Sequence, residues 1–200
     1  MGIRDQILAA HPDAISAQYN YSNIYIADFA DRTASARSVE VSDAPQVCPI
    51  SGGPMDSAVF HNPTTMSVEF VQYDDHRYID LTGKIVKHCE GTLFPANEAD
   101  VKWTAMLELK DCLPQNILNH VFKARRQIFN VTKDLRDRHI LSSQKVFGVF
   151  SCPREHTAYN DTVFGDVIQQ TRLKRYTGII YVGTNEVMLI DKNTCIPMGI

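Results

Sequence analysis

Glu108 and Lys110 are the residues whose types and spacing are best suited to chemistry. They follow an apolar run, 103–107, and one residue separates them. Residues i and i+2 of a β-strand project from the same face, so we expect the carboxylate and the ammonium to lie side by side. Such a pair at a strand end can hold a divalent metal and an activated water beside a phosphate. The same spacing is also common on the solvated face of an edge strand, so further residues must identify a site.

Glu90 is the predicted partner of this pair. Residues 84–94 and 101–110 both have strand patterns, and a short turn joins them, which predicts a hairpin. Positions whose numbers add to about 198 then lie opposite one another, which places Glu90 across from Glu108 at a Cβ separation of about 4.5–5.5 Å. Two carboxylates at that separation can share one cation. A register shifted by one residue would turn Glu90 to the other face.

Asp80 and Asp100 are the other acidic candidates for a shared metal ion. Asp100 precedes Glu108 by eight residues, and an extended strand of about 3.3 Å per residue carries it too far away. Asp80 belongs to another predicted strand and would approach only if that strand lies beside 101–110. We therefore rank Glu90 first and Asp80 second.

Hydrophobic periodicity predicts the elements that position these residues. Helices are expected over 5–17, over 113–138 and over 161–170. The long helix has Pro114 in its first turn and one apolar stripe, formed by Ile117, Leu118, Val121, Ala124, Ile128, Val131 and Leu135. Strand patterns occupy 23–29, 38–41, 67–73, 77–81, 84–94, 101–110, 143–152, 177–182 and 186–190.

Turn residues predict how some of these strands are connected. The segment 74–76 predicts a hairpin of 67–73 with 77–81, and Gly183-Thr184-Asn185 predicts a terminal hairpin. The segment 42–65, with four prolines and two adjacent glycines, predicts irregular loop and turn.

The bulk properties predict one domain of mixed α and β structure. Two hundred residues suit one domain, and 44% hydrophobic with 22% charged residues is typical of a soluble globular protein. Within it we distinguish an N-terminal helix, strands and Pro-rich loop (1–65), a central core (66–151), and a C-terminal helix and hairpin (152–200).

The order of these features resembles the PD-(D/E)xK nuclease superfamily. An acid on one strand is followed by Glu-x-Lys at the end of the next and then by an amphipathic helix. In that helix Ala124-Arg125-Arg126-Gln127 is similar to the Ala-x-x-Gln pattern of several branches, and 144–151 would be the fourth core strand. The resemblance covers residues 84–151. It implies a restriction-endonuclease-like mixed sheet flanked by helices, here with an additional N-terminal β-rich region.

The resemblance implies a metal-dependent nuclease that hydrolyses phosphodiester bonds of DNA or, as the lesser option, RNA. Glu90 and Glu108 would ligate Mg²⁺ or Mn²⁺, with Asp80 as the alternative ligand. Lys110 would orient the attacking water and stabilise the charge that develops on phosphorus. Gln127 would hold a water that lies beyond the direct metal ligands, or Lys110 itself.

Two departures from the family pattern keep other functions open. The first acid is Glu90 where the family usually has Asp, and only Asp5 or Asp13 could supply the helix-borne acid of some members. Because a fold does not establish an activity, the alternative is a non-catalytic nuclease-fold protein that serves as a nucleic-acid or protein interaction module. A hydrolase that uses Cys152 or Cys89 with a nearby His lacks a Gly-rich setting for its nucleophile.

Charge and cysteine content bound the partners and the compartment. A net charge of −3 means that any contact with DNA must come from local basic patches. Such patches are predicted on the long helix and after it, at Lys123, Arg125, Arg126, Lys133, Arg136, Arg138, Arg172, Lys174 and Arg175. Interleaved acids predict the i,i+4 pairs Lys133–Asp137 and Asp134–Arg138, which are also typical of a solvated helix face. The oligomeric state stays open, with a dimer as one option.

Five dispersed cysteines (48, 89, 112, 152 and 195) without a Cys-x-x-Cys pair predict buried, reduced thiols and a cytoplasmic protein. The sets Cys152–His156 and His88-Cys89 match no structural zinc spacing. No segment has the roughly eighteen apolar residues of a membrane span, so no membrane partner is expected. The first eight residues carry an acid and no long apolar region, so they do not predict a signal peptide.

Overall fold

The computed structural model describes residues 1–28, 39–47, 52–53, 55–73, 77–97, 100–110, 112–155, 159–160 and 164–198. In chain order its elements are α1 (Ile3–Ala10), β1 (Ile15–Tyr19), β2 (Asn23–Asp28), β3 (Val39–Ser42), β4 (Ala58–His61), β5 (Val68–Gln72), β6 (Tyr78–Ile79), β7 (Ile85–Val86), β8 (Gly91–Pro95), β9 (Trp103–Leu109), the 3₁₀ turn η1 (Pro114–Asn116), α2 (Ile117–Asp137), β10 (Lys145–Ser151), α4 (Val167–Thr177), β11 (Ile179–Gly183), β12 (Glu186–Asp191) and β13 (Thr194–Pro197). The protein therefore has the mixed α and β structure that the sequence predicts.

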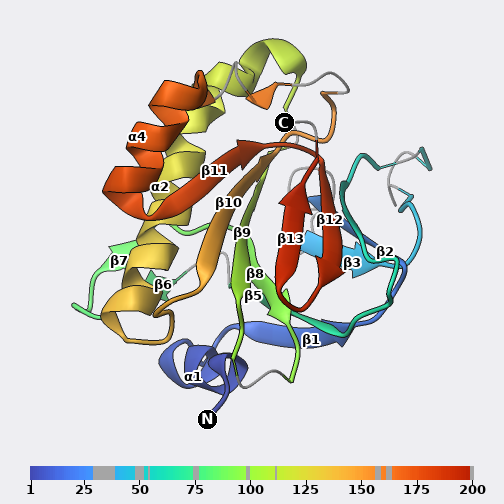
Figure 1. Ribbon diagram of the computed structural model, residues 1–200. Helices are drawn as coiled ribbons and strands as arrows, with labels where there is room; N and C mark the ends of the chain where they lie inside the picture. The colour runs from blue at the N-terminus through green and yellow to red at the C-terminus, as the bar shows by residue number, and fades with distance from the viewer. Residues whose placement is uncertain are drawn as a thin grey trace.

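Two sheets and a layer of helices build the molecule (Figure 1). A mixed six-stranded sheet has the order β1-β5-β8-β9-β10-β11, and a second sheet has the order β13-β12-β4-β2-β3. Helices α2 and α4 lie on one face of the six-stranded sheet, and the five-stranded sheet covers its other face. None of the described helices combines the length and the apolar character needed to cross a membrane.

Strand β9 lies between the two cores. All seven of its residues are buried. Met106 packs in the core on the helix side, whereas Leu107 packs in the core between the sheets. A strand covered on both faces needs apolar residues at consecutive positions, which explains the unbroken run 103–107. The same alternation turns Glu108 toward the helix side of the sheet.

Topology brings one set of ends together. Strands β5, β8 and β9 are antiparallel neighbours, and helix α2 then crosses to β10, which pairs parallel to β9. Helix α4 makes the next crossing to β11, which pairs parallel to β10. One end of the six-stranded sheet therefore brings together the ends of β9 and β10, the start of β8 and the starts of α2 and α4. We call it the strand-end edge.

The predicted register of β8 with β9 is confirmed. Gly91 pairs with Leu107 and Leu93 with Ala105, so paired numbers add to 198. One step further along the same register, Glu90 lies opposite Glu108. Five apolar residues of β9 and the short turn before it leave little freedom for another alignment.

The helices differ from the sequence prediction at their ends. The first helix stops at Ala10, and 15–19 forms strand β1 instead of continuing it, because Pro12 cannot donate a helical hydrogen bond and restricts the residue before it. Helix α4 starts after Asp166, whose side chain accepts from Gln169 N, and not at residue 161. Residues 161–163 of the predicted helix lie outside the described residues. The long helix is confirmed, with Pro114 in the 3₁₀ turn that precedes α2.

Both predicted hairpins other than β8–β9 are wrong. Strand β5 pairs with β1 and β8, while β6 pairs with β7 in a separate small sheet. The terminal strands β11 and β12 belong to different sheets, so 183–185 carries the chain from one layer to the other. The predicted strand 84–94 is broken into β7 and β8, and the predicted loop 42–65 contains strand β4.

Candidate functional site

Glu90, Glu108 and Lys110 meet at the strand-end edge. Lys110 Nζ lies 2.7 Å from Oε1 of Glu108 and 3.8 Å from Oε1 of Glu90. Glu108 lies near the end of β9, Lys110 follows that strand, and Glu90 precedes β8. One ammonium therefore contacts the carboxylates of two neighbouring strands, as the hairpin register requires.

Solvent exposure of the side chains increases from Glu108 through Glu90 to Lys110. The Glu108 side chain is completely buried, whereas those of Glu90 and Lys110 are 12% and 24% exposed. Lys110 is the charge partner of Glu108 Oε1. Glu108 Oε2 is also buried and accepts no hydrogen bond from any residue that the structure describes. A buried carboxylate oxygen without a donor is costly, and a cation is one way to satisfy it.

Burial and neighbouring charge set the protonation of the pair. Burial raises the pKa of Glu108 to about 8, the Lys110 ammonium works in the opposite direction, and Glu90 adds to the rise. Burial alone would lower the pKa of Lys110, but the carboxylates of Glu108 and Glu90 outweigh it and raise that pKa above its ordinary value. Lys110 is therefore a cation at neutral pH and does not act as a base.

Asp28 is a third carboxylate that acts on this cluster. It ends β2 of the other sheet and is 9% exposed. Its negative charge adds to the rise in the pKa of both Glu108 and Lys110. Sequence reasoning missed Asp28 because a strand pattern does not reveal which strand of a second sheet will pack nearby.

Gln127 positions the chain before Glu90. Its Nε2 donates to the His88 carbonyl at 2.6 Å, and Asn130 Nδ2 donates to the Lys87 carbonyl at 2.8 Å. Nε2 of Gln127 thus holds the backbone, and the expected hold of Gln127 on a water or on Lys110 stays a prediction. Two amides on successive turns of α2 hold the break between β7 and β8, where Tyr73 N also donates to the Glu90 carbonyl. Asn130 carried no motif and was not predicted.

Asp80 does not join the cluster. It lies in the turn between β6 and β7, where it accepts from the backbone N–H groups of Thr82 and Lys84. Hydrogen bonding by Thr82 and by the Lys84 backbone lowers the pKa of Asp80. Because β6 is not a neighbour of β9, Asp80 organises a turn and is set aside as a metal ligand. No group of three or more His, Cys, Asp or Glu side chains suited to a metal occurs among the described residues.

The cysteines behave as structural thiols. The four that the structure describes are buried and free of disulfides, and Cys48 lies outside the described residues. Cys112 Sγ lies 3.6 Å from Cys152 Sγ. Burial raises the pKa of Cys152 and of Cys89, which keeps both as thiols. A thiol is a poor nucleophile, so this argues against a cysteine hydrolase.

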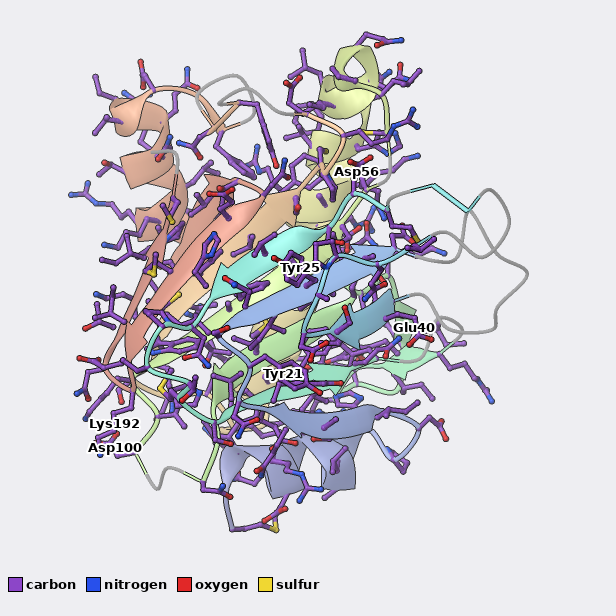
Figure 2. The ribbon with its side chains drawn as sticks, turned by 90° about the vertical axis from the view of Figure 1, so that its right-hand side faces the viewer. Tyr21, Tyr25, Glu40, Asp56, Asp100 and Lys192 are labelled. Carbon is purple, nitrogen blue, oxygen red and sulfur yellow. The ribbon has the colours of Figure 1, made fainter. Side chains whose placement is uncertain are left out.

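A cavity of about 450 Å³ is lined by residues of both large sheets and of the segment that follows β10. Tyr25 and Asp56, both labelled in Figure 2, are among its lining residues. Its described lining also includes the carboxylates of Glu155 and Glu186 and contains no Lys, Arg or His. A lining of this charge repels anions such as phosphate.

Both acidic residues of α2 are paired with basic residues. Both predicted i,i+4 pairs are confirmed, Lys133 with Asp137 and Arg138 Nε with Asp134 Oδ2 at 2.9 Å. Asp134 is 3% exposed and also accepts from Tyr78 OH at 2.9 Å. Its contact with His11 Nε2 at 3.1 Å ties α1 to α2. This interior carboxylate is therefore part of the core and contributes little to the charge of the helix surface.

Three kinds of comparison bear on identity. The chain matches no protein-family model, no curated protein and no solved structure. Its function must be inferred from the strand-end cluster.

Proposed function

We propose that the protein is a metal-dependent nuclease with a restriction-endonuclease-like core, which hydrolyses phosphodiester bonds of DNA. The observation that carries this proposal is the contact of one ammonium, Lys110 Nζ, with the carboxylates of Glu108 and Glu90 at the ends of two adjacent strands. Two acids and a cation at the end of a sheet are the parts that phosphoryl chemistry needs.

The order of the elements supports a core of this kind. Three antiparallel strands (β5, β8 and β9) precede a helix that crosses to a parallel fourth strand, β10. The first acid lies at the start of the second strand, and Glu-x-Lys lies at the end of the third. The five-stranded sheet occupies the face where the resemblance implies a helical layer, so the core would be a variant with an added β-layer.

The residues present fit a divalent metal ion. Glu108 Oε2 is buried without a donor among the described residues, and Glu90 adds a second hard oxygen donor beside it. Mg²⁺ is commonly held by only one or two carboxylates and completes its octahedron with water and substrate phosphate oxygens. A set of two carboxylates is therefore sufficient, and Mn²⁺ would suit the same oxygen ligands.

Each residue then has a defined role. Bound metal would supply Lewis-acid stabilisation of the charge on the phosphoryl group. Lys110, held as a cation, would orient the attacking water and stabilise the same charge electrostatically. Gln127 and Asn130 would fix the backbone that presents Glu90, because they hold the carbonyl groups of His88 and Lys87.

Cleavage assays with matched variants test the proposal. The full chain is incubated with plasmid and with single-stranded DNA in Mg²⁺, Mn²⁺ or EDTA. We expect metal-dependent cleavage that falls about 100-fold or more in Glu108→Gln and in Lys110→Met, since several kcal/mol of charge stabilisation are lost. Asp80→Asn is the control and should retain activity, because Asp80 holds only a turn. Cleavage that survives both Glu108→Gln and Lys110→Met would overturn the assignment.

One observation favours a second candidate function. The complete burial of Glu108 under Lys110 is also what an internal ion pair of a non-catalytic, nuclease-fold interaction module would show. Mn²⁺ titration by calorimetry separates the two. Binding that requires Glu108 and Glu90 supports the nuclease, whereas wild-type chain that binds no metal supports the interaction module.

A further inference from the structure

We propose that the outer faces of α2 and α4 form a docking surface for single-stranded nucleic acid that leads to the strand-end edge. This surface, which we call the α2–α4 face, consists of Lys123, Arg126, Arg172 and Arg175 with the aromatic residues Phe122 and Tyr176. A single strand is thus the form of substrate that we infer, and this rests on the proposed function.

Positive charge is concentrated on these two helices. Helix α2 has five basic and two acidic residues, and α4 has three basic and no acidic residues. The whole chain has a net charge of −3, so the remainder of the protein is strongly acidic. A local positive field on an acidic protein attracts a polyanion to one place.

The acids of α2 do not cancel this field. Asp134 is buried and bonded to Tyr78, His11 and Arg138, and Asp137 is paired with Lys133. Both acids lie in the last turns of α2. Its earlier turns, which begin at the strand-end edge, therefore present basic residues without an acidic neighbour on the same helix.

Large apolar side chains stand in solvent among these charges. Helix α4 has no buried residue, and Tyr176 is 88% exposed. On α2, Phe122 is 76% exposed and lies 5.9 Å from the Arg125 guanidinium. Leu118, which the stripe predicted to be buried, is 57% exposed. Exposed rings interleaved with guanidinium groups are the means by which proteins stack unpaired bases while neutralising the backbone.

The face is held in place against the rest of the fold. Arg136 of α2 donates through Nη1 to the Thr177 carbonyl at 2.7 Å and through Nη2 to the Gly178 carbonyl at 2.9 Å. Gly178 ends α4 in the left-handed region, and a Cβ there would lie 2.9 Å from Arg136 Nη1. The two helices are thus fastened at their C-terminal ends, and their starts point to the edge that holds Glu108 (Figure 1).

Chemistry favours a single strand over the other occupants. A second copy of this chain docked symmetrically would place Arg172 and Arg175 against the same like-charged face. A duplex would offer phosphates but keep its bases stacked inside, which leaves Phe122 and Tyr176 without a partner. A single strand offers both phosphates and free base faces.

Binding measured without cleavage tests the inference. A fluorescent oligothymidylate of about 20 nucleotides, longer than a typical single-strand site, is titrated with full chain in EDTA at several salt concentrations, beside a duplex of equal length. We expect single-strand binding at least about tenfold tighter than duplex binding, since each stacked base adds roughly 1–3 kcal/mol. Arg172→Ala/Arg175→Ala should make the slope of log affinity against log salt shallower by about 1.4, since each phosphate contact contributes about 0.7.

Aromatic variants and a matched control complete the design. Phe122→Ala and Tyr176→Ala should each weaken single-strand binding at least about fivefold and leave duplex binding unchanged. The control variant Lys102→Ala/Lys145→Ala removes two exposed lysines at the starts of β9 and β10, far from the strand-end edge. It should leave single-strand binding unchanged. All these side chains are exposed, so circular dichroism melting curves should match wild type and exclude misfolding.

Three results would overturn the docking surface. The first is a loss of single-strand affinity in Lys102→Ala/Lys145→Ala equal to that in Arg172→Ala/Arg175→Ala. The others are duplex binding as tight as single-strand binding, and a dimer that Phe122→Ala and Tyr176→Ala dissociate. Failure of the nuclease proposal looks different. If the oligonucleotide binds as expected but no metal supports cleavage, the surface stands and the active site fails. If duplex DNA is cleaved without single-strand binding, only the surface fails.

Discussion

The Lys110 ammonium lies 2.7 Å from Oε1 of Glu108, a carboxylate with no exposed surface. The two residues are neighbours on one face because they are two positions apart near the end of a strand. What makes the pair unusual is burial: β9 is covered by helices on one face and by a second sheet on the other. The ion pair is therefore far less screened than a surface pair would be.

Removal of the ammonium should destabilise the fold. Lys110→Met leaves the buried Glu108 carboxyl without its charge partner, and we expect the free energy of unfolding to fall by about 3 kcal/mol at a pH of about 9.5, above the Glu108 pKa of about 8. Urea denaturation measures the change. The double variant Glu108→Gln/Lys110→Met should recover part of the loss, because no charge then remains buried. Additive effects of the two substitutions would show that the residues are not energetically coupled.

Asp134 should confer a pH dependence of stability at the acid end. Burial favours its protonated form, but hydrogen bonds from His11, Arg138 and Tyr78 outweigh burial and lower its pKa below 3.8. An acid with a lowered pKa in the folded state stabilises the fold above pH 3.8 and loses that contribution as the pH falls through the folded pKa.

The variant Asp134→Asn tests this dependence. It should cost about 3 kcal/mol at pH 7, because a buried charge is removed from four partners, the side chains of His11, Tyr78 and Arg138 and the Leu81 backbone N–H. Below pH 3.8 the two proteins should converge in stability, as followed by urea denaturation from pH 7 to pH 3. A constant difference across that range would contradict the expected ionisation of Asp134. Ser143→Ala, an exposed substitution beyond α2 at a residue that does not titrate, is the control.

Gln127 should support the site through the backbone that presents Glu90. Gln127→Ala removes the 2.6 Å hydrogen bond to the His88 carbonyl, and we expect metal affinity to fall about 10- to 100-fold, the usual effect of losing a group that orients a ligand. Calorimetric Mn²⁺ titration measures it. Asn119→Ala, an exposed substitution on the same helix, controls for changes in helix stability. Equal metal affinity in wild type and Gln127→Ala would remove Gln127 from the site.

Gly91 should be intolerant of any side chain. A Cβ at this position would lie 2.5 Å from Phe70 Cζ and 2.7 Å from the Val71 carbonyl oxygen, so β5 would have to move away from β8. Gly91→Ala should destabilise the protein by about 1–3 kcal/mol, measured by thermal or urea denaturation. Gly2→Ala, whose Cβ would have no neighbour closer than 4.0 Å, should be neutral. A neutral Gly91→Ala would mean that the β5–β8 contact is looser than described.

The sequence by itself determined the local arrangement around the site. The spacing of Glu108 and Lys110 placed them on one face, and the apolar run and short turn set the register that brings Glu90 opposite Glu108. The helical periodicity of α2 likewise identified the pairs Lys133–Asp137 and Asp134–Arg138. These features depend on residues close in the chain, where strand and helix geometry leave few alternatives.

Only the tertiary structure decided which elements became neighbours. An alternating pattern shows which face of a strand is buried but not which strand lies beside it, so β6 was wrongly paired with β5 and β11 with β12. For the same reason Asp28 was missed, although its charge acts on Glu108 and Lys110 from the second sheet. Helix α2 covers the face of β9 from which Met106 and Glu108 project, and that cover turns Glu-x-Lys from a surface pattern into an interior ion pair.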